Sequence, residues 1–132
     1  MKKIVLIWIT FFLCNGIDAQ TNSIPALTTS KSYGYKKNNP IKVGGGVYPS
    51  NVYDYLNNLR GVNGEEIEFE RIGSGPSYPN PDPSLTPFKQ GVLTMFKVRV
   101  KGSDVWKTIY FDQYRFEEPK IIMGFGWKMS KV

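Results

Sequence analysis

The sequence contains no histidine and only one cysteine, Cys14. Without histidine the chain lacks the commonest general base and metal ligand, and it cannot build Ser-His or Cys-His nucleophile pairs. A single cysteine cannot close a disulfide within the chain or supply a cysteine cluster for zinc. The 132 residues also fall well short of the roughly 250 that a (β/α)₈ barrel requires. The sequence therefore excludes several classes of enzyme without identifying a function.

The first nineteen residues follow the order of features in a secretory signal peptide. A basic start, Lys2-Lys3, precedes a nearly continuous apolar run over 4–13 and a polar exit that ends at the small residue Ala19. The run is too short for a helix across a bilayer, which takes about 20 residues. We therefore expect residues 1–19 to be a signal peptide and the protein to be exported, to the periplasm or beyond. An N-terminal core strand or helix is the alternative.

Cys14 allows a second form of export, as a lipoprotein held at a membrane face. The bulky Phe12 and Leu13 precede it, whereas small residues usually precede a lipid-modified cysteine.

If cleavage follows Ala19, Cys14 leaves with the signal, and the net charge falls from +6 to +5 because two lysines and one aspartate leave. A positive charge favours anionic surfaces such as lipid headgroups or polysaccharide, and an exported protein seldom meets nucleic acid.

Composition and periodicity divide the remaining chain into a leader and one domain. Residues 20–32, rich in Thr, Ser and Asn, predict a flexible leader before a domain over 33–132. Apolar residues at helical spacing over 52–59, with Ser50 as cap and Gly61 as stop, predict one amphipathic helix. Alternating patterns predict strands over 41–43, 65–72, 92–100 and 105–112, the last two as a hairpin, and a closing strand within 121–129. We expect an α+β fold, with a small antiparallel sheet of three to four strands and one packed helix.

Glycine and proline mark two loops. Gly44, Gly45 and Gly46 lie between a predicted strand and the predicted helix. A structural turn is the simpler interpretation there, since a phosphate cradle would need a longer motif that is absent. Five prolines within residues 73–87 predict a long loop without a central strand or helix. Such a loop is either functional or disordered.

Aromatic and basic residues gather in and after the second strand of the predicted hairpin. Trp106 and Tyr110 alternate onto one face, and Tyr114 and Arg115 follow. If this face is exposed, it is a stacking platform for a glycan or an envelope protein. If the face is covered, these aromatic residues belong to the core, as most do in small domains. We take these four residues as the candidate ligand- or partner-binding residues.

Carboxylates support a competing, catalytic hypothesis. The candidates are Glu65, Glu66, Glu68 and Glu70 in one predicted strand, with Asp112, Glu117 and Glu118 farther along. Two of them converging across a cleft could act on a glycosidic bond. Strand alternation, however, turns the glutamates of the strand outward into solvent, and no calcium-loop motif is present. We therefore assign no catalytic, cofactor-binding or metal-binding residue and expect no cofactor.

An ordered series of short motifs covers most of residues 33–125. It comprises Tyr33-Gly34-Tyr35, Asn39 to Gly45, Tyr55-Leu56-Asn57, Leu59-Arg60-Gly61, Asn63-Gly64-Glu65, Glu70 to Ser74 and Phe116 to Lys120. With the hairpin, this series resembles a family of small exported or lipid-anchored envelope proteins of Gram-negative bacteria, whose function is unknown. Some members carry the label 2-dehydro-3-deoxyphosphooctonate aldolase, which would imply a lyase. Members often have paired cysteines after the Gly-Ser step, where this chain has Gly75 to Tyr78, so the resemblance supplies no catalytic residue.

The leading hypothesis is a non-catalytic binding or accessory module of the cell envelope. The alternatives are a lyase or aldolase-type enzyme and a carboxylate-dependent hydrolase. An enzyme requires two carboxylates, or a lysine and a carboxylate, that converge in a closed pocket. A binding module requires Trp106 or Tyr110 exposed on a flat or shallow face.

Overall fold

The computed structural model describes residues 24–129. The predicted signal peptide, Cys14 and the start of the expected leader lie outside this range. The elements in chain order are β1 (Ile41–Lys42), α2 (Ser50–Asn58), β2 (Leu59–Gly61), β3 (Ile67–Pro79), β4 (Gln90–Val100), β5 (Lys107–Asp112) and β6 (Phe125–Trp127). The fold is thus largely β, with one short helix. No helix within 24–129 has the length and apolar character to cross a bilayer.

The main sheet contains four strands in the order β1-β5-β4-β3. β4 pairs antiparallel with both β3 and β5, and the β4–β5 pairing confirms the predicted hairpin, with Val98 opposite Lys107. β1 instead runs parallel to β5, so the sheet is mixed and the expectation of a wholly antiparallel sheet is wrong for this pair. β1 meets β5 only after the chain has passed through α2, β3 and β4, and a two-residue strand carries no local signal for its direction.

β3 continues into the proline-rich segment that was expected to be a loop from residue 73. Its 13 residues include Pro76 and Pro79. β3 is an edge strand of the sheet, where a proline can turn its missing N–H side away from the pairing partner. The register with β4 shifts twice, between Arg71 and Gly73 and between Ser74 and Ser77. These irregularities accommodate residues that a central strand would exclude.

The predicted ends of the helix and the predicted closing strand both need correction. α2 follows Pro49 and has no side-chain cap, so Ser50 is not its capping residue. Leu59 has extended backbone (φ −72°, ψ 140°) and begins β2, so Gly61 lies within a strand instead of stopping the helix. β6 pairs antiparallel with β2 as a separate two-stranded sheet and does not close the main sheet.

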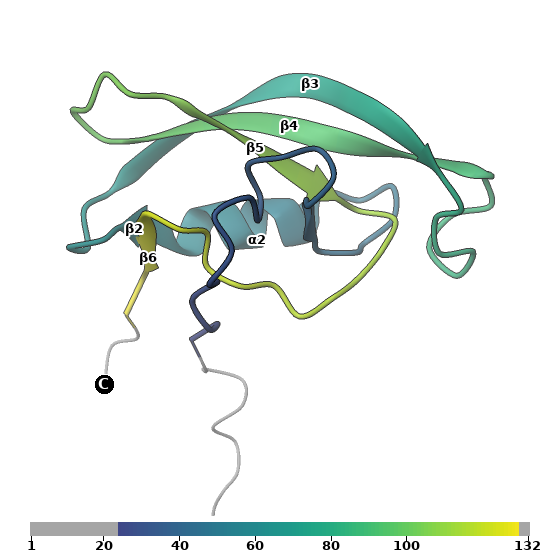
Figure 1. Cartoon of the computed structure of the whole chain (residues 1–132), viewed down its shortest axis with the longest axis horizontal. Coiled ribbons are helices and arrows are strands. Elements are labelled where there is room, and N and C mark those ends of the chain that lie inside the picture. The colour runs from purple at the N-terminus through teal and green to yellow at the C-terminus, as the bar shows by residue number, and fades with distance from the viewer. Residues whose placement is uncertain (1–23, 130–132) are drawn as a thin grey trace, which may run out of the picture.

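One hydrophobic core fills the space between α2 and the main sheet (Figure 1). Its fully buried members include Val52 and Leu56 of the helix, Phe96 and Val98 of β4, and Ile109 and Phe111 of β5. Phe96 is at its centre and meets the rings of Tyr53, Phe69 and Phe111 at centroid distances between 5.6 and 6.1 Å. The apolar faces predicted for the helix and the hairpin are therefore the faces that meet.

Residues 24–32, part of the expected leader, lie against the C-terminal part of the chain. The N–H of Thr28 donates to the carbonyl of Ile121 at 3.0 Å, and the N–H of Ile121 donates to the carbonyl of Ala26 at 2.8 Å. Asn39 Nδ2 donates to Ser32 Oγ at 2.9 Å. The first two bonds position residues 26–28 beside the segment that leads into β6, and the third connects Ser32 to the chain before β1.

Candidate functional site

The predicted binding residues lie on and beside the face of the main sheet that points away from α2. In Figure 1 the helix lies below the sheet, and no described element crosses the opposite side. Cross-strand register places five side chains on this side: Glu68 and Glu70 of β3, Lys97 and Arg99 of β4, and Thr108 of β5. Trp106, the residue before β5, joins them through its contacts with Lys97 and Arg99. We call these six residues the Trp106 face.

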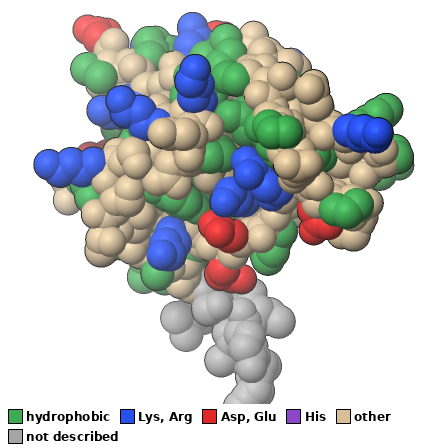
Figure 2. Space-filling model, turned by 45° about the vertical axis from the view of Figure 1, so that its right-hand side comes forward, with side chains coloured by type: hydrophobic (Ala, Val, Ile, Leu, Met, Phe, Trp, Pro, Cys, Tyr) green, Lys and Arg blue, Asp and Glu red, His purple; other side chains and the backbone are tan. Residues whose placement is uncertain are grey.

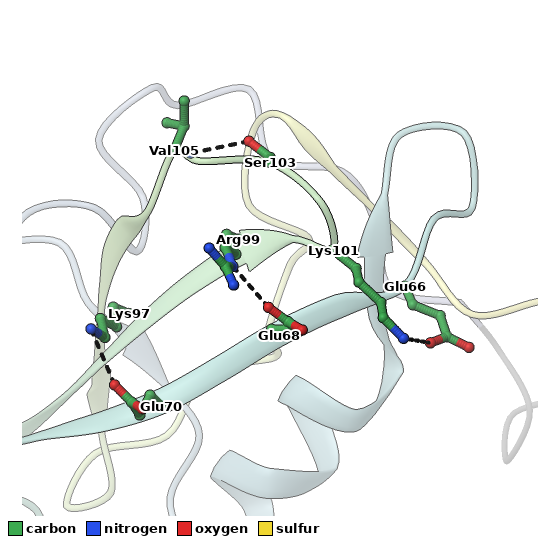
Figure 3. Close-up of polar contacts among 8 residues, drawn as sticks. All are labelled: Glu66, Glu68, Glu70, Lys97, Arg99, Lys101, Ser103 and Val105. Carbon is green, nitrogen blue, oxygen red and sulfur yellow. Dashed lines mark hydrogen bonds and ion pairs between the residues drawn. The ribbon is translucent and has the colours of Figure 1, made fainter.

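Ion pairs connect β3 to β4 across this face (Figure 3). Arg99 Nε donates to Glu68 Oε1 at 2.8 Å, and Lys97 Nζ lies 3.1 Å from Glu70 Oε1. The glutamates therefore point outward, as strand alternation predicts, but each has a basic partner. Exposed pairs of this kind contribute only about 0–1 kcal/mol to stability, so their main effect is to fix the positions of the two cations.

Trp106 lies against the same two cations. The ring centroid is 4.4 Å from Arg99 Cζ and 4.7 Å from Lys97 Nζ, within the range of cation–π attraction. Each cation is thus held between a carboxylate and the indole. These contacts orient the indole, although 37% of Trp106 is exposed.

The other three predicted residues do not all join Trp106. Tyr110 shares its side of the sheet, opposite Met95, but is partly buried, and its N–H donates to the carbonyl of Gly34 at 2.8 Å. Tyr114 and Arg115 lie beyond the far end of β5 and contact Asp112. The structure therefore separates the four predicted residues: Trp106 is exposed, Tyr110 is partly buried on the same side of the sheet, and Tyr114 and Arg115 belong to a cluster around a buried acid.

Asp112 is the fully buried carboxylate of that cluster. Its Oδ1 accepts hydrogen bonds from the Tyr78 hydroxyl at 2.5 Å and the Tyr114 N–H at 2.9 Å, and its Oδ2 accepts one from Arg115 Nε at 2.6 Å. Arg115 Cζ is 3.9 Å from the Tyr78 ring centroid. Burial, reinforced by the hydrogen bond to Asp112, raises the pKa of Tyr78, so this hydroxyl remains a proton donor at neutral pH. The cluster clamps the end of β5 to β3.

Asp112 is one of the candidate acids of the sequence, whereas its partner Tyr78 lies in the proline-rich segment and was not predicted. A signal was present in Gly91, which is opposite Tyr78 in the β3–β4 pairing. A Cβ on Gly91 would collide with the tyrosine ring, and glycine inside a strand often marks such a close approach.

The triple-glycine turn is filled by the protein itself. Gly44, Gly45 and Gly46 all have positive φ, and a Cβ on Gly46 would lie 2.7 Å from the carbonyl oxygen of Leu85. The buried side chain of Gln113 donates to the carbonyl of Gly46 at 2.9 Å. These contacts support the structural interpretation of the turn over a phosphate cradle. Among residues 24–129, no three acidic, cysteine or histidine side chains are grouped as a metal site.

A groove of about 300 Å³ lies between α2 and the segment after β5. We call it the α2 groove. Its lining residues are Asn51, Asp54, Tyr55 and Asn58 of α2, Phe116, Glu118 and Pro119 of the facing segment, and Pro25, Val43 and Trp127. The four helical residues form one stripe at i, i+3, i+4 and i+7. The groove leaves no signal in the sequence because its two walls are distant in the chain.

The α2 groove contains two carboxylates, Asp54 and Glu118, and no basic residue among those that line it. Both acidic residues are exposed and the groove is open, whereas the enzyme hypothesis requires a closed pocket. The basic residues elsewhere are dispersed, as Figure 2 shows for one side of the molecule. The groove therefore carries negative charge on a protein that is basic as a whole.

Comparison of the chain with family models, with curated proteins and with solved structures gives no match. The resemblance to envelope proteins stays a prediction, and the functional assignment rests on the surfaces described above.

Proposed function

We propose that this protein is a non-catalytic, exported module that binds a protein of the cell envelope through the Trp106 face. The main support is the position of Trp106, which is 37% exposed and held by Arg99 and Lys97 on the uncovered side of the sheet. Tryptophan and arginine are the residue types that most often dominate the binding energy of protein interfaces.

The charges of the Trp106 face favour a protein partner over a glycan. Two cations already contact the indole, so a sugar ring would have to displace them or use only the remaining ring surface. A protein surface can contact the indole and, at the same time, complement the alternating acidic and basic residues around it. Such charge complementarity selects one partner against others.

Export is supported by the signal-like order of residues 1–19 and by the resemblance to envelope proteins. A lipid anchor on Cys14 would hold the protein at a membrane surface. In either form the binding face belongs to the folded domain and does not depend on the mode of attachment.

Site-specific photo-cross-linking in the producing cell tests this function. A photoreactive residue replaces Thr108, an exposed member of the Trp106 face, or Asn57, an exposed residue of α2 that serves as the control. We expect one envelope protein to cross-link from position 108 and not from 57. Trp106→Ala should remove the product, whereas Phe116→Ala, which truncates another exposed aromatic residue, should not.

Two results would contradict the proposal. One is an unchanged product at position 108 in the Trp106→Ala chain. The other is the absence of any protein product together with Trp106-dependent retention on purified envelope glycan, which would make the partner a glycan.

A further inference from the structure

The α2 groove has the dimensions and lining of a small-ligand site. Its volume of about 300 Å³ is at the lower end of the range for small-molecule pockets. Six of its ten lining residues are apolar or aromatic, and the other four, Asn51, Asp54, Asn58 and Glu118, are polar. A mainly apolar surface with a few convergent polar groups is the usual composition of a binding site.

The carboxylates of the groove are available to a ligand. Five ion pairs occur within residues 24–129, and none of them includes Asp54 or Glu118. The neighbouring Glu117, by contrast, pairs with Lys42 at 3.6 Å. Two unneutralised carboxylates on a protein of net charge +6 form a local negative region that attracts cations and repels anions.

The side-chain donors of the groove are largely occupied. Asn51 Nδ2 donates to the carbonyl of Val43 at 3.0 Å, and Asn58 Nδ2 donates to the carbonyl of Asp54 at 2.8 Å. The Tyr55 hydroxyl donates to the carbonyl of Lys120 at 2.7 Å. The polar groups that remain are mostly acceptors, so the groove suits a ligand rich in hydrogen-bond donors.

An exposed aromatic ring completes the wall opposite the helix. The side chain of Phe116 is largely exposed, with 60% of the residue accessible. Its backbone is held in place by an antiparallel β-bridge to Val43, and the next residue, Glu117, donates its N–H to the carbonyl of Lys42 at 3.0 Å. Trp127 also lines the groove, and its ring centroid is 5.2 Å from that of Tyr55. Aromatic rings beside carboxylates favour organic cations, because the ring faces attract positive charge and the carbon atoms of the ligand lose contact with water.

We propose that the α2 groove binds a small organic amine. The ammonium group lies between Asp54 and Glu118, and the carbon chain lies against Phe116 and Trp127. This site is separate from the Trp106 face, so the protein has two binding surfaces of different chemistry.

Calorimetric titration of the purified exported protein with 1,5-diaminopentane tests the site. Two compounds of similar length serve as controls: pentane-1,5-diol, which is neutral, and glutarate, which is negatively charged. We expect saturable binding of the diamine only, and weaker binding as salt is raised because the charges are exposed. Asp54→Asn and Glu118→Gln should each weaken binding about fivefold, the factor for one unit-charge contact near 4 Å in water.

The controls separate this site from a general charge effect and from the Trp106 face. Asp104→Asn removes an exposed carboxylate that lies outside the groove and should leave binding unchanged, as should Trp106→Ala. Equal binding of the diol, or unchanged binding after both groove carboxylates are replaced, would overturn the proposal. Tighter binding of the blocked peptide acetyl-Gly-Lys-Gly-amide than of the diamine would overturn the assignment to a free amine in favour of a lysine side chain.

Discussion

Replacement of Asp112 by asparagine should destabilise the fold by about 1.5–3 kcal/mol, the range for hydrogen bonds to a charged group. The carboxylate is fully buried and accepts bonds from Tyr78, Tyr114 and Arg115. The carbonyl oxygen of asparagine can still accept from Tyr78 and Tyr114. Its NH₂ group would then face the Arg115 guanidinium, so two donors would oppose each other.

The loss should stay below the about 3–5 kcal/mol seen when a fully buried ion pair is broken. The Arg115 side chain is 36% exposed, so water can solvate part of its charge after the partner has gone. Urea unfolding followed by circular dichroism measures the change. Combining Asp112→Asn with Arg115→Ala should reveal a coupling free energy above about 1 kcal/mol, as expected for residues in direct contact.

Glu68→Gln is the matched control, because it removes the charge of a partly exposed carboxylate that also pairs with arginine, at 2.8 Å. It should cost no more than about 1 kcal/mol. If Asp112→Asn costs no more than this control, Asp112 does not clamp β5 to β3, and the structural role assigned to the cluster is wrong.

Three other predictions concern packing and pH. Phe96→Ala should cost about 3–5 kcal/mol in urea unfolding, because the ring is buried among three others; a loss below 1 kcal/mol would contradict its central place in the core. Gly91→Ala should cost about 1–3 kcal/mol in the same assay through overpacking, since the new Cβ would collide with the Tyr78 ring; an unchanged unfolding free energy would contradict this close approach. Burial raises the pKa of Tyr35 from 10.0 to about 12, so its contribution to stability is complete below pH 10 and is lost as the pH rises toward 12. The difference in ultraviolet absorbance between the unaltered chain and Tyr35→Phe should therefore place the ionisation of this tyrosine near pH 12, and its titration near pH 10 in the folded protein would refute the assignment.

Local patterns in the sequence predicted the parts of the fold that depend on side-chain alternation. Phe96 and Val98 alternate with Lys97 and Arg99, and the structure buries the first pair and directs the second to the Trp106 face. Once Val98 is placed opposite Lys107, Arg99 must oppose Trp106. The cation–indole contact could therefore have been found from the hairpin register alone.

Features that depend on distant segments could not be predicted in this way. The parallel pairing of β1 with β5 joins segments separated by most of the domain. Pro76 and Pro79 are compatible with a strand only because β3 lies at the sheet edge, which no local pattern shows. The α2 groove likewise combines the helix with a segment after β5, and only the tertiary fold brings Asp54 and Glu118 to one groove.

The central claim is that Trp106 contacts the protein partner. Its most direct test compares Trp106→Ala with the unaltered chain and measures, on the same two proteins, the unfolding free energy and the yield of cross-linking from position 108. Trp106 is an exposed contact residue in this account, so its removal should change the unfolding free energy by no more than about 1–2 kcal/mol, the sum of two exposed cation–π contacts. Cross-linking should fall by about 30-fold or more, as for the loss of an interface hot spot of about 2 kcal/mol. A large loss of stability with undiminished cross-linking would show that Trp106 serves the fold and not the interaction.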